Sequence, residues 1–259
     1  KKRRSLGVGV SNLAALLAKE GLKYWDKDAP NFVAKWMEKT SYYLIKASVE
    51  MAKEVGKCEK FDRTKFSQGV LPIDTYKRDV DEFITEPLHC DWETLREEIK
   101  KHGMRHSTLT ACMPVESSSV VINSTNGIEM PMSLISVKES KAGSFVQVVP
   151  EYHKLKNKYQ MMWEQKDCEG YLKTAAVIAA YVDQSISTNT FYNPAHWPDR
   201  KVPTTLIARN LMQAHHWGLK TFYYSLINKA GSKMIKEDAP APMLEIDFDL
   251  EEDCESCKL

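Results

Sequence analysis

Apolar residues recur along the chain in short runs and at helical spacing, and the pattern predicts strands that alternate with helices. Apolar runs at residues 6–10 and 108–113, and an aromatic run at 219–226, are typical of strands. Spacings of three and four residues predict helices over residues 12–20, 31–55, 92–102, 152–163, 170–187 and 204–217. This alternation predicts an α/β architecture.

Polar and helix-breaking residues divide this pattern. Residues 61–105 are mixed and polar, so we expect a small inserted subdomain over about 62–107. The dipeptide Asn126-Gly127 predicts a hairpin or a loop. The three prolines at 194, 198 and 203 predict an irregular connection before the last helix.

Composition excludes a disordered protein, because 43% of the 259 residues are hydrophobic and 27% are charged. Lys and Arg number 36 against 35 Asp and Glu, which gives a net charge of +1. Binding to DNA or to an anionic membrane is therefore not expected. The remaining charge is local, with a basic run at residues 1–4 and seven acidic residues among the last fifteen.

Neither a membrane span nor a signal peptide is visible in the sequence, which favours a cytoplasmic protein. The sequence opens without Met, on a basic run followed at once by core-like residues. We therefore expect a fragment, a processed chain or one chain of a split subunit.

The six cysteines are too sparse for a disulfide framework. Four stand singly and are interpreted as buried structural thiols: Cys58, Cys90, Cys112 and Cys168. Cys254 and Cys257 form a C-x-x-C pair that suits either an exchanging dithiol or half of a zinc site, and the dithiol is favoured because no second pair of metal-like residues stands near it. The surrounding acids raise the thiol pKa, so efficient exchange needs a partner with its own activated thiol.

A glycine motif near the start is weaker. Gly7 and Gly9 supply two glycines of a dinucleotide-binding fingerprint, but Asn12 stands where the third belongs. A tight strand-to-helix turn is favoured over a nucleotide loop.

A serine-rich turn lies between the strand at 108–113 and the following helix start, with the sequence Pro114-Val115-Glu116-Ser117-Ser118-Ser119. Hydroxyls beside the unpaired amides of a helix start form a phosphate cradle or an ordinary helix cap. The pattern alone favours the cap, since the anionic Glu116 repels a phosphate unless its side chain turns away.

Tyr223 and Tyr224 end the last aromatic run. On a regular strand, adjacent side chains point to opposite faces, which favours one tyrosine in the core and one at a surface. If the backbone bends, the two phenols can instead stack and relay electrons and protons.

Taken together, several segments resemble the large, catalytic subunit of class I ribonucleotide reductase, in its C-terminal portion. They occur in the family's order over essentially the whole chain, at residues 4–10, 71–77, 86–89, 108–119, 126–129, 183–187 and 220–224 and at the final dithiol. Each motif is weak alone, but their order makes the match specific.

The resemblance implies the role of each candidate residue. Pro114, Val115, Glu116, Ser117 and Ser118 would grip the diphosphate of a ribonucleoside diphosphate substrate. Tyr223 and Tyr224 would relay a radical from a small partner subunit to an active-site cysteine. Cys254 and Cys257 would re-reduce the active-site disulfide and then be reset by thioredoxin or glutaredoxin.

The sequence differs from the family at two positions, and it lacks the part of the subunit that holds the radical-bearing cysteine. Val115 stands where the family often has serine, and the tail pair is closer in sequence than in well-known members. In the family, the radical-bearing cysteine, its acid/base neighbours, the two electron-donating cysteines and the allosteric sites all lie N-terminal to the part matched. This chain therefore cannot reduce a ribonucleotide by itself.

By resemblance, residues 1–235 form the C-terminal half of a ten-stranded α/β barrel, and residues 236–259 form a flexible acidic redox tail. A half-barrel exposes sheet edges and apolar surface, so tight association with the N-terminal half is expected. No metal is assigned to this chain. The resemblance places the radical or metal cofactor in the small subunit. The C-terminal tail of that subunit would contact residues 204–217.

Two other functions are open. A non-catalytic scaffold or assembly module derived from the reductase is the main rival, although a scaffold needs neither a relay nor a mobile dithiol. An independent thiol oxidoreductase would be expected to carry its C-x-x-C at a helix start within the fold.

Overall fold

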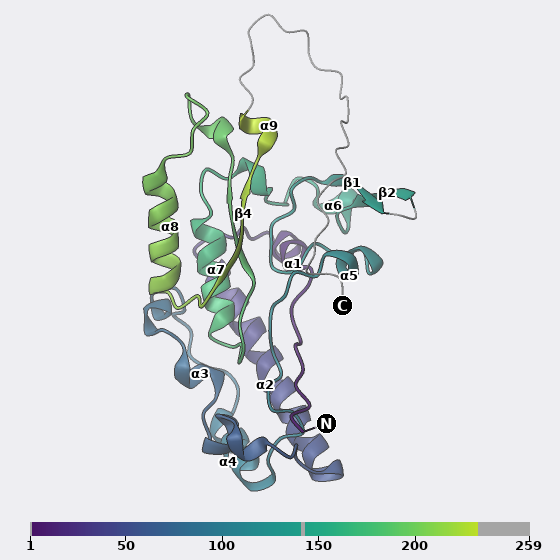
Figure 1. The fold of residues 1–259 in the computed structure, drawn as a ribbon, viewed down its shortest axis with the longest axis vertical. Coiled ribbons are helices and arrows are strands. Elements are labelled where there is room, and N and C mark those ends of the chain that lie inside the picture. Colours follow the sequence, from purple (N-terminus) through teal and green to yellow (C-terminus); the bar gives the residue numbers. More distant parts are fainter. Residues whose placement is uncertain (1, 141–142, 233–259) are drawn as a thin grey trace, which may run out of the picture.

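The computed structural model describes residues 2–140 and 143–232, in which extended segments run alongside one another with helices packed around them (Figure 1). The helices are α1 (Leu13–Glu20), α2 (Ala29–Val55), α3 (Pro72–Thr75), α4 (Trp92–His102), α5 (Glu116–Val121), α6 (Tyr152–Leu155), α7 (Glu169–Ala179), α8 (Thr204–His216) and α9 (Lys229–Ser232). The strands are β1 (Ile135–Ser140), β2 (Gly143–Val148), β3 (Thr188–Tyr192) and β4 (Phe222–Ile227). This mixed composition confirms the α/β class.

Four extended segments form one parallel array that carries the candidate site. Single parallel bridges join Val8 to Thr110 and Cys112 to Ile186, and β3 pairs in parallel with β4. The lateral order is therefore residues 6–10, residues 108–112, residues 185–192 with β3, and β4. Helices lie between consecutive segments along the chain, as parallel pairing requires.

The array stays open in the part of the chain that the structure describes, and a closed barrel is not seen there. Its two edge segments, residues 6–10 and β4, are largely exposed. The predicted strands at 6–10 and 108–113 are extended as expected, but each is joined to its neighbours by isolated bridges rather than a continuous ladder.

Helix α2 is the longest element and supports the array. Pro30 starts its first turn and Gly56, at φ 83°, ends it. The helix buries Val33, Met37 and Ile45 and packs against α4 and α7. The helices expected over residues 12–20, 31–55, 92–102 and 204–217 are confirmed within two residues at each end.

Several predicted elements are wrong in extent. The helix expected over 152–163 is only α6, and the helix expected over 170–187 ends at Ala179. Residues 183–187 instead pair with the segment at 108–112, so long-range pairing overrides the apolar helical pattern. Asn126-Gly127 is a loop, and the hairpin is formed by β1 and β2.

The polar region between α2 and the second extended segment is built from α3, α4 and short 3-10 turns. It is tied to α2 by the buried carboxylate of Glu38, which accepts hydrogen bonds from the backbone of His89 and Cys90 and from the Trp92 indole. The division into residues 1–235, an excursion at 62–107 and a tail stays a prediction.

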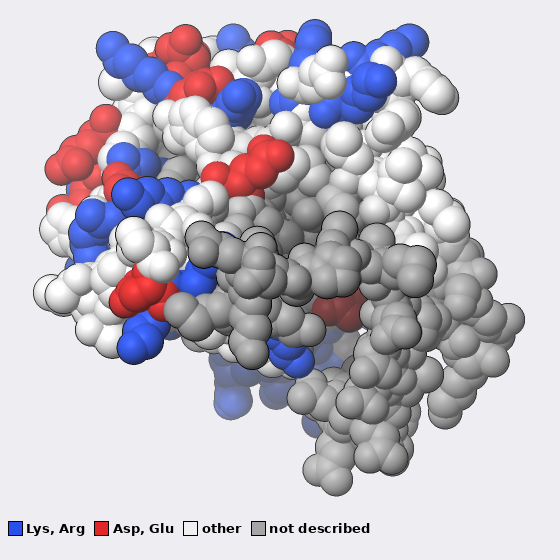
Figure 2. Space-filling view, turned by 90° about the horizontal axis from the view of Figure 1, so that it is seen from above, with Lys and Arg blue, Asp and Glu red and all other residues white. Residues whose placement is uncertain are grey.

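Charge is mixed over the described surface. Basic and acidic side chains are interspersed on the face shown in Figure 2. Within residues 2–140 and 143–232, no helix combines the length and apolar character needed to cross a bilayer.

Asp183 fastens the middle of the parallel array. Its carboxylate accepts hydrogen bonds from the backbone N–H groups of Leu109 and Thr110, at 2.7 and 2.9 Å. In return, the hydroxyl of Thr110 accepts from the backbone N–H of Asp183 at 2.9 Å. This reciprocal contact fixes the segment that leads directly into the serine-rich turn.

We expect Asp183→Asn to lower the free energy of unfolding by about 2 kcal/mol, because an amide cannot accept both backbone N–H bonds without turning a donor toward one of them. Urea denaturation of the chain measures this change. Asp62→Asn, which alters an exposed ion pair with Lys57, is the control and should cost less than about 1 kcal/mol. Equal effects would show that the contact does not stabilise the array.

Candidate functional site

The serine-rich turn, residues 114–118, lies between the second extended segment and α5 and is called here the 114–118 loop. Pro114 and Val115 are half-buried, whereas Glu116, Ser117 and Ser118 are exposed. Val115 is the N-cap of α5, and no side chain caps this helix. The hydroxyl cap favoured by the pattern alone is therefore wrong, and the two exposed hydroxyls are directed to solvent.

Two hydrogen bonds, one to an asparagine side chain and one from a serine hydroxyl, anchor the loop. The backbone N–H of Val115 donates to Asn126 Oδ1 at 3.1 Å. The buried hydroxyl of Ser119 donates to the carbonyl of Glu116 at 2.6 Å. These bonds hold the backbone at both ends of the exposed part of the loop.

Glu129 is linked to the loop through Asn126, and its carboxylate accepts hydrogen bonds from two asparagines. Its Oε2 accepts from Asn126 Nδ2 at 3.0 Å, and its Oε1 accepts from Asn189 Nδ2. Burial raises the pKa of Glu129, the two amide bonds oppose this rise, and the nearby charge of Glu116 adds to it. Glu116 and Glu129 both line a cavity of about 340 Å³, and Ser117 and Ser118 are not among its lining residues.

The rings of Tyr223 and Tyr224, the tyrosine pair, are in close contact and tilted against each other. The ring centroids lie 4.1 Å apart with an interplanar angle of 55°, and the two residues are 48% and 50% exposed. The expectation of one tyrosine in the core and one at the surface is therefore wrong, and the alternative of a bent backbone describes the geometry.

A bulge in β4 produces this ring contact. Thr188 pairs with Phe222 but Thr190 pairs with Ser225, so both tyrosines stand opposite the single residue Asn189. A bulge re-aims side chains that would otherwise alternate across the strand. Asn189 Oδ1 accepts a hydrogen bond from the backbone N–H of Tyr224 at 2.9 Å, which satisfies a group within the bulge.

The tail dithiol, Cys254 and Cys257, lies outside the described residues. Of the other cysteines, Cys58, Cys112 and Cys168 are buried and Cys90 is half-buried, and all four are free thiols. The interpretation as buried thiols is thus confirmed for three of them. Burial raises the pKa of Cys112 and of Cys168 to about 11.

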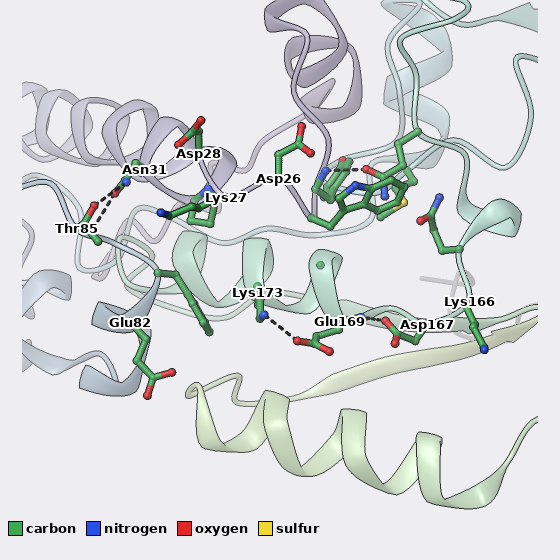
Figure 3. A pocket seen from close by; sticks show the side chains of 18 residues that line it. Asp26, Lys27, Asp28, Asn31, Glu82, Thr85, Lys166, Asp167, Glu169 and Lys173 are labelled. Carbon is green, nitrogen blue, oxygen red and sulfur yellow. Dashed lines mark hydrogen bonds and ion pairs between the residues drawn. The ribbon is translucent and has the colours of Figure 1, made fainter.

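A second cavity, of about 690 Å³, lies among the first turn of α2, the residues before α4 and the start of α7 (Figure 3). Charged side chains line it, but Lys173 pairs with Glu169 at 2.8 Å and Asp167 pairs with Arg209 at 3.0 Å. Of these two ion pairs, only Lys173–Glu169 joins two residues of the cavity wall, because Arg209 lies outside it. The described residues contain no group of three or more His, Cys, Asp or Glu arranged to hold a metal ion.

Comparison with known families identifies the family of the chain. The family model described as the ribonucleotide reductase barrel domain matches residues 1–159 and 149–225. The chain belongs to the ribonucleotide reductase barrel-domain family. Within that family it corresponds to the C-terminal barrel portion of the class I alpha subunit.

Named members of this reductase family are similar over nearly the whole chain. The chain is 47% identical over 259 residues to ribonucleoside-diphosphate reductase 1 subunit alpha of Salmonella typhimurium, covering 99% of this chain and 33% of that protein. It is 50% identical over 222 residues to the subunit of that name from Escherichia coli, covering 86% and 29%, respectively. The alpha subunit of Enterobacteria phage T4 is 41% identical over 261 residues, or 100% of this chain and 33% of the phage protein.

The chain therefore spans about one third of the length of the curated reductase relatives it matches. The sequence identified the 114–118 loop and the tyrosine pair as candidates, but it gave no role to Asn126, Glu129 or Asn189. Asn126 and Glu129 stand in a segment that carried the family resemblance, which was a usable signal. Asn189 lies in a strand that the apolar pattern missed, so no local signal marked it.

We expect Cys112 and Cys168 to resist alkylation by iodoacetamide at pH 8, because thiols with a pKa of about 11 hold little thiolate at that pH. Peptide mass spectrometry with and without urea measures the difference. Half-buried Cys90 is the internal control and should react sooner. Alkylation of Cys112 or Cys168 as fast as Cys90 would contradict the burial.

Proposed function

We propose that this chain is the C-terminal part of the large subunit of a ribonucleoside-diphosphate reductase, which makes deoxyribonucleotides for DNA synthesis by radical chemistry. The observation that carries the proposal is the close ring contact of the two tyrosines, set by a bulge in a chain that belongs to the reductase family. Two phenols in ring contact and half exposed suit proton-coupled electron transfer toward a partner surface.

The 114–118 loop supplies substrate binding in this proposal. Ser117 and Ser118 are exposed and are not among the residues that line the cavity with Glu116 and Glu129, so their hydroxyls are open to a diphosphate from solvent. Backbone N–H groups of the loop complete the contacts. Val115 lacks the hydroxyl that the family often has there, so binding relies more on the amides and on the two serines.

The rest of the large subunit completes the reductase. The chain has about a third of the relatives' length, and the radical-bearing cysteine with its neighbours is expected in the missing N-terminal half. Large apolar side chains near the loop are strongly exposed, with Val121 at 84% and Ile122 at 65%. Exposed apolar side chains at the end of α5, together with the open array edges, suit a surface that the N-terminal half covers.

The remaining partners follow from the same proposal. A small subunit holds the radical and its metal cofactor, and its C-terminal tail binds α8, where Met212 is 73% exposed. Cys254 and Cys257 re-reduce the active-site disulfide and exchange with thioredoxin or glutaredoxin. The complex works in the cytoplasm.

We expect Tyr224→Phe to abolish nucleotide reduction while leaving binding of the ribonucleoside diphosphate unchanged, because phenylalanine keeps the ring but has no phenol to oxidise. The assay uses the complete large subunit, or this chain joined by its N-terminal half, with the small subunit present. Deoxynucleotide formation and substrate affinity are both measured.

Tyr43→Phe is the matched control for that experiment. Tyr43 also contacts an adjacent tyrosine ring, Tyr42 at 5.3 Å, but it lies on α2 outside the site. Its variant should keep full activity. Turnover by the Tyr224→Phe enzyme would refute the relay, and absence of turnover by the unaltered complex would favour the scaffold.

We expect the double change Ser117→Ala and Ser118→Ala to raise KM for the ribonucleoside diphosphate on the order of 10- to 100-fold, because two hydrogen bonds to a charged group are lost. Steady-state kinetics over a substrate series measures KM and kcat separately. Ser5→Ala, at an exposed serine that contacts Ser107, is the control. An unchanged KM would remove the loop from substrate binding.

A further inference from the structure

We propose that Glu129 is a positioning residue that holds the 114–118 loop and the tyrosine pair in a fixed relation. The inference rests on the proposed function for its kinetic meaning. It names a role for a side chain that neither binds the substrate nor carries the radical in that proposal.

One continuous path of hydrogen bonds joins the two parts of the site through Glu129. On one side, Oε2 accepts from Asn126 Nδ2 at 3.0 Å, and Asn126 Oδ1 accepts from the N–H of Val115 at 3.1 Å. On the other side, Oε1 accepts from Asn189 Nδ2 at 2.5 Å, and Asn189 Oδ1 accepts from the N–H of Tyr224 at 2.9 Å. We call the side chains of Asn126, Glu129 and Asn189 the amide bracket.

The carboxylate of Glu129 determines the direction of every hydrogen bond in the amide bracket. An ionised carboxylate only accepts hydrogen bonds, so both asparagines must turn their NH₂ groups toward Glu129. Each asparagine then presents its oxygen outward, which is the atom that a backbone N–H requires. The charge at residue 129 therefore orients acceptors at Val115 and Tyr224 together.

The surroundings keep the amide bracket rigid. Asn189 is 7% exposed, and Ile128 and Met130, on either side of Glu129, are buried. The hydroxyl of Tyr24 donates to the carbonyl of Ile128 at 2.8 Å. Charge-assisted hydrogen bonds in such a site are stronger than the same bonds in water.

The amide bracket acts on the bulge itself. Tyr223 and Tyr224 both stand opposite Asn189, so Tyr224 has no partner of its own in the strand register. Asn189 supplies the acceptor that a regular strand would supply. Loss of this bond frees β4 to return toward alternation, which separates the two rings.

The first test is Glu129→Gln in the assembled reductase. Glutamine places an NH₂ group against one asparagine, which must turn and lose its backbone N–H. We expect kcat to fall roughly 10- to 100-fold, as for other displacements of reacting groups by about 1 Å. Asn126→Ala should mainly raise KM for the ribonucleoside diphosphate, and Asn189→Ala should mainly lower kcat.

The second test moves the negative charge from residue 129 to residue 189 and asks whether activity returns. With Asn189→Asp alone, two carboxylates face each other and activity should fall further. In the double variant Glu129→Gln with Asn189→Asp, the introduced glutamine donates its NH₂ group to the introduced aspartate, and its oxygen accepts from Asn126. The second oxygen of the aspartate accepts from the N–H of Tyr224. We expect this double variant to recover most of the lost kcat.

Hydrogen exchange in the same assembled protein provides a readout that does not depend on turnover. We expect Glu129→Gln to raise amide exchange in peptides that contain Val115 or Tyr224, and the double variant to restore protection. Glu151→Gln, at an exposed ion pair with Lys19, should change neither kinetics nor exchange.

The outcomes separate this inference from the proposed function. An active unaltered enzyme whose Glu129→Gln variant keeps its kinetics and exchange would overturn the amide bracket, and so would a double variant no better than Glu129→Gln alone. An inactive unaltered complex that shows the expected exchange changes would refute the proposed function while supporting the structural basis of the amide bracket.

Discussion

The candidate site depends on one hydrogen bond at the bulge of β4, where two residues stand opposite one residue of β3. The donor is the backbone N–H of Tyr224, and the side chain of Asn189 accepts from it. Because a backbone donor that is partly shielded from water needs a partner, the acceptor and the bulge stabilise each other. The ring contact of the tyrosines follows from this arrangement, and the link to Glu129 connects it to the 114–118 loop.

Local patterns predicted the elements whose own residues decide their structure. Helices α2, α4 and α8 have clear apolar faces and clear ends, so sequence located them closely. The pattern failed at residues 183–187, which were assigned to the end of the preceding helix, because Asp183 pairs with Thr110 about seventy residues away. Strand β3 is buried at every position and shows no alternation of polar and apolar residues, so no strand was predicted there.

The candidate site was predictable in the same uneven way. Motif order identified the 114–118 loop and the tyrosine pair, yet the ring contact of Tyr223 with Tyr224 required a register shift that adjacent letters cannot reveal. The hydroxyl cap was favoured because serines usually cap helices, but Val115 occupies the cap position. Glu129 and Asn189 are sixty residues apart, so only folding brings them together.

The order of segments in the parallel array has a consequence for how the protein is made. Residue 8 pairs with residue 110, and residue 112 pairs with residue 186, so each contact closes a loop of about seventy to a hundred residues. Contacts of such long range are slow to form, because loop entropy is lost before pairing compensates for it. The first extended segment therefore finds its neighbour only after about a hundred further residues have been synthesised. The tyrosine contact forms last in synthesis, because β4 follows the other three segments along the chain.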